Sequence, residues 1–426
     1  MKRTILLLSL VASGLFVALL PARPVTTIPT VPNGVIEPTV SATSVAYCGW
    51  VRSDSAIDMS VQLASPRDTQ ATVTVLQDGG VVSSEPRAVD PFGSVRVASL
   101  LAVGVEGALV EFAAGPAGAT AIGDGALGLV AASCPSTVPA VWVLGGGSTA
   151  EGLTLDLRLF NPFPEDAKLT IRALSENGSE PDQSLEALSV PAQSSRTIAL
   201  ADILGFRDWL SVEIDQTDGR VIPTFVEQAG TGGTAVLSGV ATAGDWYFPF
   251  GGVPELANTL VLVNPSATPI GYQVGRATST GVGEELDRGS IDPRQVATIG
   301  LVAGEGYFVQ ADAPLAAFLV SRGESRRASV AGSNVPATDW LLPGAGALPE
   351  TTVVILNPTL DDITATVVSR LGQEKVVVAG GGVTSVSVPV SDGGMQVLAT
   401  GPVVVGWYAV SENGVAYAMG LPFVNE

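Results

Sequence analysis

Short runs of apolar residues, many of them alternating with polar ones, follow one another along most of the chain, and turn residues separate them. Residues 245–265 show the pattern best: an aromatic run starts at Trp246, a Gly-Gly pair makes a turn, and a second run from Leu260 stops at an Asn-Pro pair. Alternation with a period of two is typical of half-buried strands, and proline cannot donate to a strand ladder. The pattern therefore predicts short strands joined by tight turns.

The same pattern occurs four times. The copies begin near Tyr47, Trp142, Trp246 and Trp340, so their starts lie 95, 104 and 94 residues apart. That spacing is typical of a domain and exceeds the period of roughly 20–50 residues found in solenoids. It predicts four modules, at residues 45–138, 139–242, 243–336 and 337–426.

Each module contains a series of short predicted strands separated by turn signals such as Asn177-Gly178, a typical hairpin turn. The predicted fold class is all-β, with four tandem immunoglobulin-like β-sandwich modules. A propeller-like closure is the alternative, but a blade normally takes about 40–50 residues, so one module is too long for one blade. Almost no linker separates the modules, which predicts a stiff rod or arc.

Residues that recur at the same place in the last three modules are expected to build the fold rather than a site. A tryptophan supplies a large buried area and an N–H that needs one partner, and the glycines behind it allow a close turn. An Asn-Pro pair ends the next strand, and its asparagine caps the freed backbone. Module 1 carries Ser65-Pro66 instead. The recurring residues are Trp142, Asn161, Pro162, Trp246, Asn264, Pro265, Trp340, Asn357 and Pro358.

The first 20 residues predict export. Two basic residues precede an apolar run at residues 4–20, which is the composition of a signal peptide or a signal anchor. The run is just long enough to span a bilayer, and a poor cleavage site follows it, so an uncleaved anchor with its basic end in the cytoplasm is favoured over a cleaved peptide. Residues 21–44 are rich in proline and threonine and predict an extended spacer.

The chain has two cysteines, Cys48 and Cys134, near the first and last predicted strands of module 1. An even count in an exported chain predicts one disulfide. The bond would close a loop of 85 residues, which contributes about 4 kcal/mol in chain-entropy estimates. The alternative is a pair of buried free thiols.

Composition narrows the possible partners. The formal net charge is −20, and hydrophobic residues make up 46% of the chain. The apolar content is too high for a disordered chain. A polyanion repels nucleic acid and anionic lipid, so nucleic acid is not an expected partner, and membrane contact is expected only through the N-terminal segment.

Few side chains suit catalysis. The chain has no histidine and only three lysines, which removes Ser-His-Asp and Cys-His catalysis and histidine-ligated zinc. Paired carboxylates can hydrolyse glycosides, and Glu284-Glu285 and Asp361-Asp362 are the candidates, but adjacent strand residues point to opposite faces. The sequence therefore predicts no catalytic, cofactor-binding or metal-binding residue.

One basic cluster interrupts the acidic background. Arg322, Arg326 and Arg327 lie with Glu324 on a predicted hairpin of module 3. Arginine forks bind carboxylates and phosphates well. The cluster could hold an anionic cell-wall polymer or an acidic face of a neighbouring module, and a solvated turn is the third interpretation.

The succession Trp-Tyr-Phe-Pro-x-Gly-Gly from Trp246, then Leu-Val-Leu-Val-Asn-Pro from Leu260, then a hairpin, is similar to an uncharacterised family of exported, membrane-anchored actinobacterial proteins made of tandem β-modules. The resemblance covers modules 2 to 4 well and module 1 loosely. It implies a place in the cell envelope and an architectural or binding role without catalysis, and it carries over no functional residues.

Together these observations predict an exported, non-enzymatic envelope protein without a cofactor. It would act as a scaffold or binding module for a cell-wall glycan or an exported protein partner. The alternative hypothesis is a divergent carboxylate-dependent enzyme acting on glycans, which a cleft with two carboxylates roughly 5–10 Å apart would favour.

Overall fold

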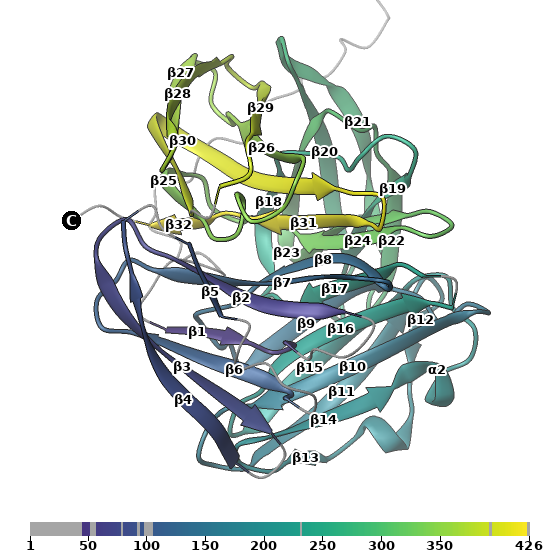
Figure 1. Cartoon of the computed structure of the whole chain (residues 1–426). Coiled ribbons are helices and arrows are strands. Elements are labelled where there is room, and N and C mark those ends of the chain that lie inside the picture. Colours follow the sequence, from purple (N-terminus) through teal and green to yellow (C-terminus); the bar gives the residue numbers. More distant parts are fainter. Residues whose placement is uncertain are drawn as a thin grey trace, which may run out of the picture.

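The computed structural model of the chain is built almost entirely from antiparallel strands (Figure 1). It describes residues 45–51, 57–77, 80–91, 94–97, 105–230, 232–391 and 394–423. The predicted anchor and spacer, residues 1–44, lie outside the described residues. The all-β prediction is confirmed. Within the described ranges, no helix has the length and apolar character needed to cross a membrane.

Repeat 1, as we name strands β1 to β8, contains two four-stranded sheets of order β1-β6-β3-β4 and β5-β2-β7-β8. Side chains from both sheets share one hydrophobic cluster, so the sheets pack face to face. The strands are β1 (Val45–Cys48), β2 (Asp58–Ala64), β3 (Thr69–Gln77), β4 (Gly80–Val89), β5 (Ser94–Val97), β6 (Gly107–Phe112), β7 (Gly118–Gly125) and β8 (Gly128–Ser133).

Repeat 2, strands β9 to β17, has sheets of order β12-β11-β15-β9, with β13 also paired to β11, and β14-β10-β16-β17. It also contains two short helical segments, η1 (Gln183–Leu185) and α2 (Leu200–Ile203). The strands are β9 (Val141–Gly147), β10 (Leu153–Asn161), β11 (Ala167–Ser175), β12 (Gly178–Glu180), β13 (Leu188–Val190), β14 (Ser194–Ala199), β15 (Leu210–Asp218), β16 (Ile222–Ala229) and β17 (Thr234–Ser238).

Repeat 3, strands β18 to β24, joins its two sheets through one long strand, β23. The first half of β23 pairs with β18 and β20, and its second half pairs with β19 and β24. The strands are β18 (Ala243–Phe248), β19 (Ala257–Val263), β20 (Ile270–Thr278), β21 (Gly281–Ile291), β22 (Val296–Gly300), β23 (Gly306–Arg322) and β24 (Arg327–Ala331).

Repeat 4, strands β25 to β32, uses the long strand β30 in the same way, and β32 adds to the far side of β25. The strands are β25 (Ala337–Leu342), β26 (Thr351–Leu356), β27 (Ile363–Ser369), β28 (Gly372–Val378), β29 (Val383–Val388), β30 (Met395–Val410), β31 (Val415–Met419) and β32 (Leu421–Phe423).

The four repeats close into a ring. Their last hairpin strands, β8, β17, β24 and β31, are edge strands that we call the inner strands. β8 packs against β17, β17 against β24, β24 against β31, and β31 returns to β8. The predicted rod or arc is therefore wrong. Four sheets whose inner strands meet at an axis are the arrangement of a four-bladed propeller. The length of each repeat argued against a propeller, but the additional residues form a second sheet in each repeat.

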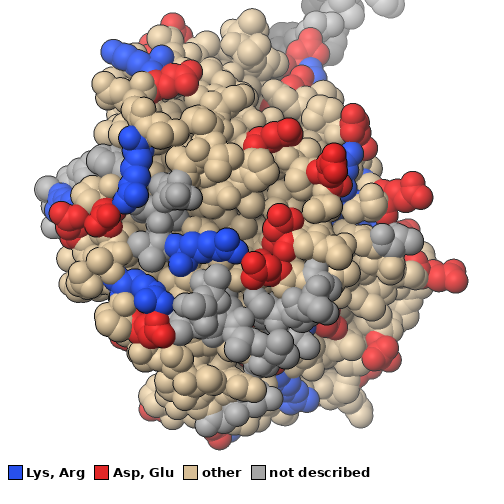
Figure 2. All heavy atoms as spheres, viewed as in Figure 1, with Lys and Arg blue, Asp and Glu red and all other residues tan. Residues whose placement is uncertain are grey.

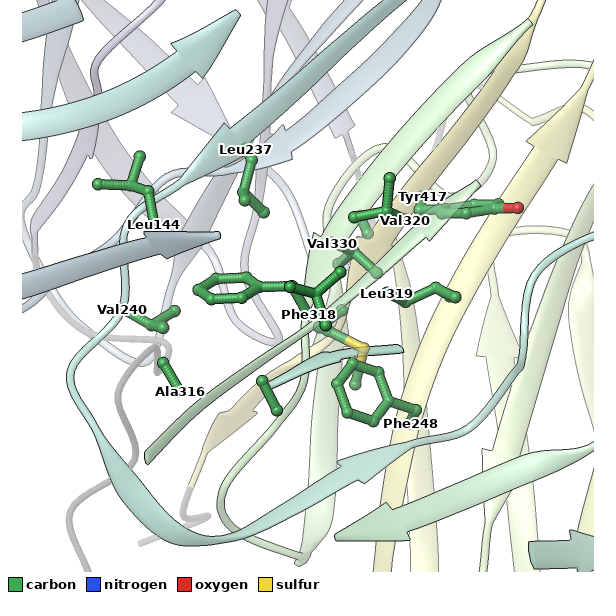
Figure 3. Packing of buried hydrophobic residues seen from close by; sticks show 14 of the residues in the cluster. Leu144, Leu237, Val240, Phe248, Ala316, Phe318, Leu319, Val320, Val330 and Tyr417 are labelled. Atoms are coloured by element: carbon green, nitrogen blue, oxygen red, sulfur yellow. The ribbon is translucent and has the colours of Figure 1, made fainter. Parts of the chain in front are cut away.

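The hydrophobic core crosses the boundaries between repeats. One cluster of buried side chains runs continuously through repeats 2, 3 and 4. Figure 3 shows Phe318 and Val330 of repeat 3 between Leu144 and Leu237 of repeat 2 and Tyr417 of repeat 4. Because apolar area is buried between repeats as well as within them, the ring is expected to be rigid rather than hinged.

Candidate functional site

The recurring tryptophans of repeats 2, 3 and 4 bind the main chain where it crosses between the two sheets of the repeat. Trp142, Trp246 and Trp340 are all fully buried. Each indole Nε1 donates a hydrogen bond of 3.0 Å to a main-chain carbonyl oxygen where the chain passes from one sheet to the other, at Val221, Leu315 and Val403 respectively. These residues hold the fold together and do not line a cleft.

The recurring asparagines form one network three times. Asn264 is fully buried, and its Nδ2 donates to the carbonyl oxygens of Thr268, Ile291 and Asp292 at 2.8–3.0 Å. Its Oδ1 accepts from the amide N of Ser266 at 2.9 Å. One side chain thus joins the two loops at this end of the repeat, and the prolines that follow the asparagines stop the strands. Asn161 and Asn357 make the equivalent bonds.

Glycines in or just after the first strand of repeats 2 and 4 allow the next repeat around the ring to approach. A methyl group on Gly145 would lie 2.5 Å from Cδ2 of Phe318, which belongs to repeat 3. A methyl group on Gly344 of repeat 4 would collide with Ile122 of repeat 1, and Gly344 also has a φ of +81°. The sequence suggested that these glycines make a close turn beneath the tryptophan; Gly145 and Gly344 also allow close packing between repeats, whereas a methyl group on Gly251 or Gly252 of repeat 3 would meet Tyr307 or Asn258 of the same repeat.

Hydroxyl groups link the repeats around the axis. In each case a side chain of one repeat donates to the repeat before it, and repeat 1 donates to repeat 4, so the set is cyclic. The bonds run from Ser238 Oγ to Ser133 O at 3.3 Å, from Ser329 Oγ to Val236 O at 3.4 Å, from Tyr417 OH to Ser321 Oγ at 2.8 Å, and from Ser133 Oγ to Met419 O at 3.2 Å.

The axis itself leaves little room for a ligand. The inner strands line a cavity of about 60 Å³ whose wall is mainly small or apolar, with Ala131, Val236, Val330 and Met419 among its residues. This volume can hold a few water molecules. It lies far below the roughly 300–1,000 Å³ of small-molecule sites.

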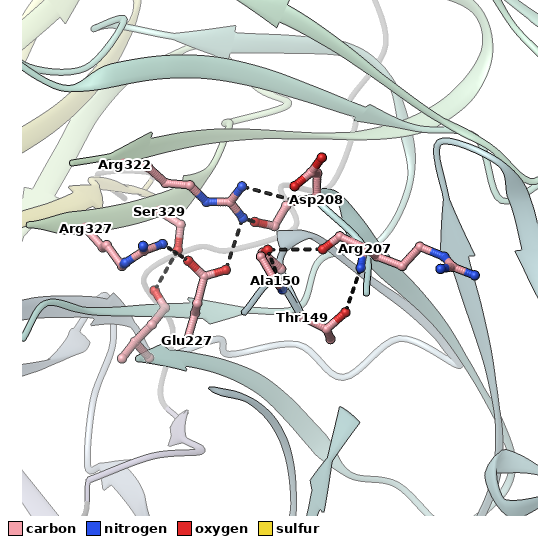
Figure 4. A network of polar contacts seen from close by, with 11 residues as sticks. Thr149, Ala150, Arg207, Asp208, Glu227, Arg322, Arg327 and Ser329 are labelled. Carbon is pink, nitrogen blue, oxygen red and sulfur yellow. Dashed lines mark hydrogen bonds and ion pairs between the residues drawn. The ribbon is translucent and has the colours of Figure 1, made fainter. Parts of the chain in front are cut away.

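Two arginines of the predicted basic cluster, Arg322 and Arg327, lie at the contact between repeats 2 and 3 (Figure 4). Arg322 Nη2 and Arg327 Nη1 donate to the two carboxylate oxygens of Glu227 on β16, at 3.0 and 2.6 Å. The guanidinium of Arg322 also lies 4.3 Å from the ring centroid of Trp209. Arg326 pairs with the exposed Glu255 of its own repeat at 3.0 Å. Of the roles expected for this cluster, the geometry supports contact with a neighbouring repeat.

The predicted disulfide between Cys48 and Cys134 is confirmed. It joins the end of β1 to the residue after β8 and so connects the two sheets of repeat 1. The candidate carboxylate pairs do not converge. Glu285 bonds Gln273 and Arg288 on the exposed β21 hairpin, and Asp362 accepts from the amide N of Gly380. Among the described residues, no three acidic or cysteine side chains are grouped to hold a metal ion.

One cleft of about 480 Å³ lies between repeat 1 and repeat 4. Asp58, Ser60 and Gln62 face it from alternate positions of β2. β5 contributes Arg96, which lies opposite Gln62, and β7 contributes Asp124, which lies opposite Asp58. Ala347, Leu348 and Pro349 of repeat 4 close the other side. Its volume is in the range of small-molecule sites.

Polarity changes with depth in this cleft. Ser60 and Gln62 are only 4% and 3% exposed, and Gln62 Nε2 donates to Ser60 Oγ at 3.1 Å. At the mouth, exposed Arg96 and Asp58 form an ion pair of 3.0 Å, and exposed Asp124 stands beside it. The floor is therefore neutral and polar, and the mouth carries both signs of charge.

At other contacts between repeats, large side chains fill the space that is open between repeats 1 and 4. Phe160 of repeat 2 packs on Gly107 of repeat 1, and Leu356 of repeat 4 packs on Gly306 of repeat 3. Ala64 holds the corresponding place in repeat 1, directly before the Ser-Pro strand end, so the contact with repeat 4 has a smaller side chain. At the position of Gln62, counting back from the strand end, the other repeats carry Arg158, Val261 and Val354.

The sequence analysis did not single out this cleft. The signal was present as Asp58, Ser60 and Gln62, three polar residues in alternate positions, but such a pattern is also typical of a plain solvent-facing strand. Figure 2 shows that charged side chains of both signs lie singly and in small groups over this face of the molecule among uncharged residues. Charge density alone therefore does not mark the cleft.

The fold and the cleft define a class: an all-β protein whose paired antiparallel sheets are arranged in a closed ring. Residues 93–331 match a family of unknown function, DUF5719. Because the match spans more than half of the chain, the protein belongs to that family. The match ends at Ala331, the last residue of β24. No curated protein matches the chain.

Proposed function

We propose that this protein is a non-enzymatic, extracytoplasmic envelope protein that acts as a scaffold or binding module for a cell-wall glycan or an exported protein partner. The observation that carries the proposal is the polar cleft between repeats 1 and 4, in a ring whose other repeat contacts are filled by large side chains. A rigid ring with one open polar contact suits recognition better than it suits a moving catalytic site.

Three further observations support a place outside the cytoplasm. A disulfide in repeat 1 is typical of an oxidising compartment. The basic and apolar start of the sequence is typical of an export signal that also serves as a membrane anchor. The resemblance to exported actinobacterial proteins points the same way.

The four units also fit the proposed immunoglobulin-like type in part. In repeats 1, 3 and 4 the second and fifth strands pair in one sheet, and the third and sixth pair in the other, as strands B, E, C and F do in that fold. Repeat 2 has two short strands, β12 and β13, in place of the fourth strand, and there β10 pairs with β14 and β11 with β15 in the same way. The segment that follows departs from that fold, because β7, β16 and the second halves of β23 and β30 pair with the second strand of their own repeat.

The test is capture by the purified full chain from isolated cell wall and from a membrane extract. We expect retention on bare wall polymer or specific recovery of one exported protein, and a chain with a filled cleft (Ser60→Trp) should lose the interaction. Arg196→Ala, at an exposed position of repeat 2, is the control. Capture of neither material by the folded wild-type chain would overturn the binding role.

A second candidate function is the carboxylate-dependent enzyme acting on glycans. Asp58 and Asp124 are directly opposed on β2 and β7 and both line the cleft; opposed residues of this kind have Cβ atoms about 5 Å apart. Incubation with wall glycan and measurement of new reducing ends tests it. Turnover lost in Asp124→Asn would establish the enzyme, and no turnover by a chain that binds glycan would reject it.

A further inference from the structure

We infer that the cleft between repeats 1 and 4 receives a lysine or arginine side chain from an exported protein partner, and that Asp124 pairs with the charged end of that side chain. The inference rests on the proposed binding function and states which partner surface fits that same site. The matching surface combines a basic side chain with an apolar neighbour.

Asp124 is an exposed carboxylate that faces the cleft without a counter-charge. It lies on β7 directly opposite Asp58 of β2, and like charges in directly opposite positions destabilise a strand pair. Asp58 already pairs with Arg96 at 3.0 Å. Among the described residues, none forms a hydrogen bond or ion pair with the carboxylate of Asp124. The lining of the cleft therefore has one carboxylate more than it has cations.

Arg96 lies too far across the sheet to neutralise Asp124. In the sheet order β5-β2-β7, Asp58 is on the strand between them. Because neighbouring strands lie about 4.8 Å apart, the strand of Asp124 is roughly 10 Å from the strand of Arg96. A cation that enters on the β7 side meets the carboxylate of Asp124 before it meets the guanidinium.

The walls next to Asp124 are apolar. Ile122 lies two residues earlier on the same face of β7, and Leu348 and Pro349 line the opposite side from repeat 4. Lysine and arginine lay their aliphatic stems along apolar surface and keep the charged end in a polar environment. An apolar wall that ends at an unpaired carboxylate therefore matches these two side chains.

The floor does not select a different ligand. Ser60 Oγ donates to the carbonyl oxygen of Ile122 at 3.5 Å and accepts from Gln62 Nε2 at 3.1 Å. Both side chains thus have hydrogen-bond partners within the protein. The unpaired group of the cleft is the carboxylate of Asp124, and a cation forms the strongest hydrogen bonds with a carboxylate.

An exposed apolar side chain beside the cleft favours a protein as the source of the cation. The amide N of Ser391 donates to the carbonyl oxygen of Gly346 at 2.9 Å, which holds the segment after β29 against the segment that leads to Leu348 and Pro349. Val390 of that segment is 59% exposed. An apolar contact next to charged groups is the usual arrangement of a protein interface.

The charge of the whole chain favours the same partner. The formal net charge is −20, and such a field attracts a cationic surface and accelerates its association. It repels an anionic wall polymer, and it adds nothing to the binding of a neutral sugar.

The experiment uses the purified full chain and four capped tripeptides with leucine at both ends and lysine, arginine, norleucine or glutamate in the middle. Maltose is the neutral sugar probe. Saturation-transfer NMR detects binding, and titration calorimetry ranks it. We expect the lysine and arginine peptides to bind, and the norleucine peptide, which keeps the stem but lacks the charge, to bind about fivefold more weakly, the effect of one exposed ion pair. No binding of the glutamate peptide or maltose is expected.

Variants assign the site. Asp124→Asn is expected to weaken binding of the lysine peptide about fivefold, and Asp124→Lys should abolish it. Asp215→Asn in repeat 2 is the matched control, because it removes an equally exposed strand carboxylate and changes the net charge by the same amount. It should bind as the wild type does. Raising the salt concentration from about 50 to 500 mM should weaken binding of the lysine peptide and leave the norleucine peptide unchanged.

No binding of the basic peptides by the folded chain, equal binding of the lysine and norleucine peptides, tighter binding of maltose than of the lysine peptide, or unchanged binding in Asp124→Asn would overturn the inference. If Asp124→Asn fails to fold by circular dichroism, the norleucine comparison and the salt dependence of the wild type decide.

The proposed function fails separately. If the full chain captures wall polymer or an exported protein and Asp124→Asn captures it equally well, the binding role stands and the basic side-chain site is rejected. If the lysine peptide binds through Asp124 but the chain captures neither material, the site stands and the envelope role is rejected.

Discussion

The hydroxyl of Ser133 in repeat 1 donates a hydrogen bond of 3.2 Å to the carbonyl oxygen of Met419 in repeat 4, 286 positions further along the chain. Both residues lie on inner strands, β8 and β31. Beside this bond, Leu421 packs with Ala64, Leu341 and Phe423 in a small apolar cluster shared by the two repeats. The first and last parts of the described chain are therefore in direct contact, and each stabilises the other.

Because the ring is closed, a substitution that destabilises repeat 4 is expected to destabilise repeat 1 as well. Leu421→Ala removes a buried side chain from the shared cluster, and such a change typically costs about 2–5 kcal/mol. We expect lower stability in denaturant unfolding and faster hydrogen exchange in β2 and β7 of repeat 1. Leu360→Ala, at a position 78% exposed, is the control. Loss of protection confined to repeat 4 would contradict mutual stabilisation across the closure.

The ion pairs between repeats 2 and 3 predict a large effect for one carboxylate. Glu227→Gln leaves Arg322 and Arg327 in a largely buried contact without a counter-charge, and breaking a buried pair from one side typically costs about 3–5 kcal/mol. Denaturant unfolding measures the loss. Glu255→Gln, which breaks the exposed pair with Arg326, should change stability by less than about 1 kcal/mol. Equal effects of the two variants would argue against the structural role of Glu227.

Close packing between repeats predicts that a single methyl group is not tolerated at Gly145. Because the added Cβ would lie 2.5 Å from Phe318 and 2.9 Å from Val263, Gly145→Ala is expected to cost about 1–3 kcal/mol through overpacking. Gly300→Ala meets open space and is expected to stay within about 0.5 kcal/mol of the wild type. Thermal unfolding of the two variants side by side makes the comparison, and a neutral Gly145→Ala would show that the repeats can separate at this point.

Burial of Tyr417 predicts a loss of stability at alkaline pH. Burial raises the pKa of its phenol to about 12 from the usual value of 10.0. The folded state therefore holds the phenolic proton more tightly, so the contribution is fully present below pH 10 and is lost as the pH rises through 10 towards 12. The full loss for a shift of two pKa units is about 3 kcal/mol.

The measurement is the free energy of unfolding between pH 8 and pH 11 for the wild type and Tyr417→Phe. The variant loses the bonds to Ser321 and to the amide N of Val253, so it should be less stable at pH 8 and should show a shallower decline with pH. Burial also raises the pKa of Tyr272 to about 12, so some decline remains in the variant. Identical slopes would exclude Tyr417 as a source of the pH dependence.

Much of the secondary structure follows from local patterns. Alternation of apolar and polar residues, as in Leu153–Asn161 and Ala167–Ser175, marks strands with one buried face. The pair Cys48 and Cys134 could also be predicted, because two cysteines in one chain allow only one intrachain pairing. These inferences need only neighbouring residues or a count.

The sequence by itself determined the strands, the fourfold repetition and the disulfide, because period-two patterning and turn chemistry act over a few residues. Tertiary structure alone decided that the repeats close into a ring. Closure depends on whether the next repeat fits against glycines at the start of the one before it, such as Gly145. Tertiary structure also decided that Arg322 and Arg327 pair with Glu227, and that Gln62 and Asp124 share a cleft. Contacts between residues 60 to 290 positions apart depend on the complementarity of whole surfaces, which no local pattern encodes.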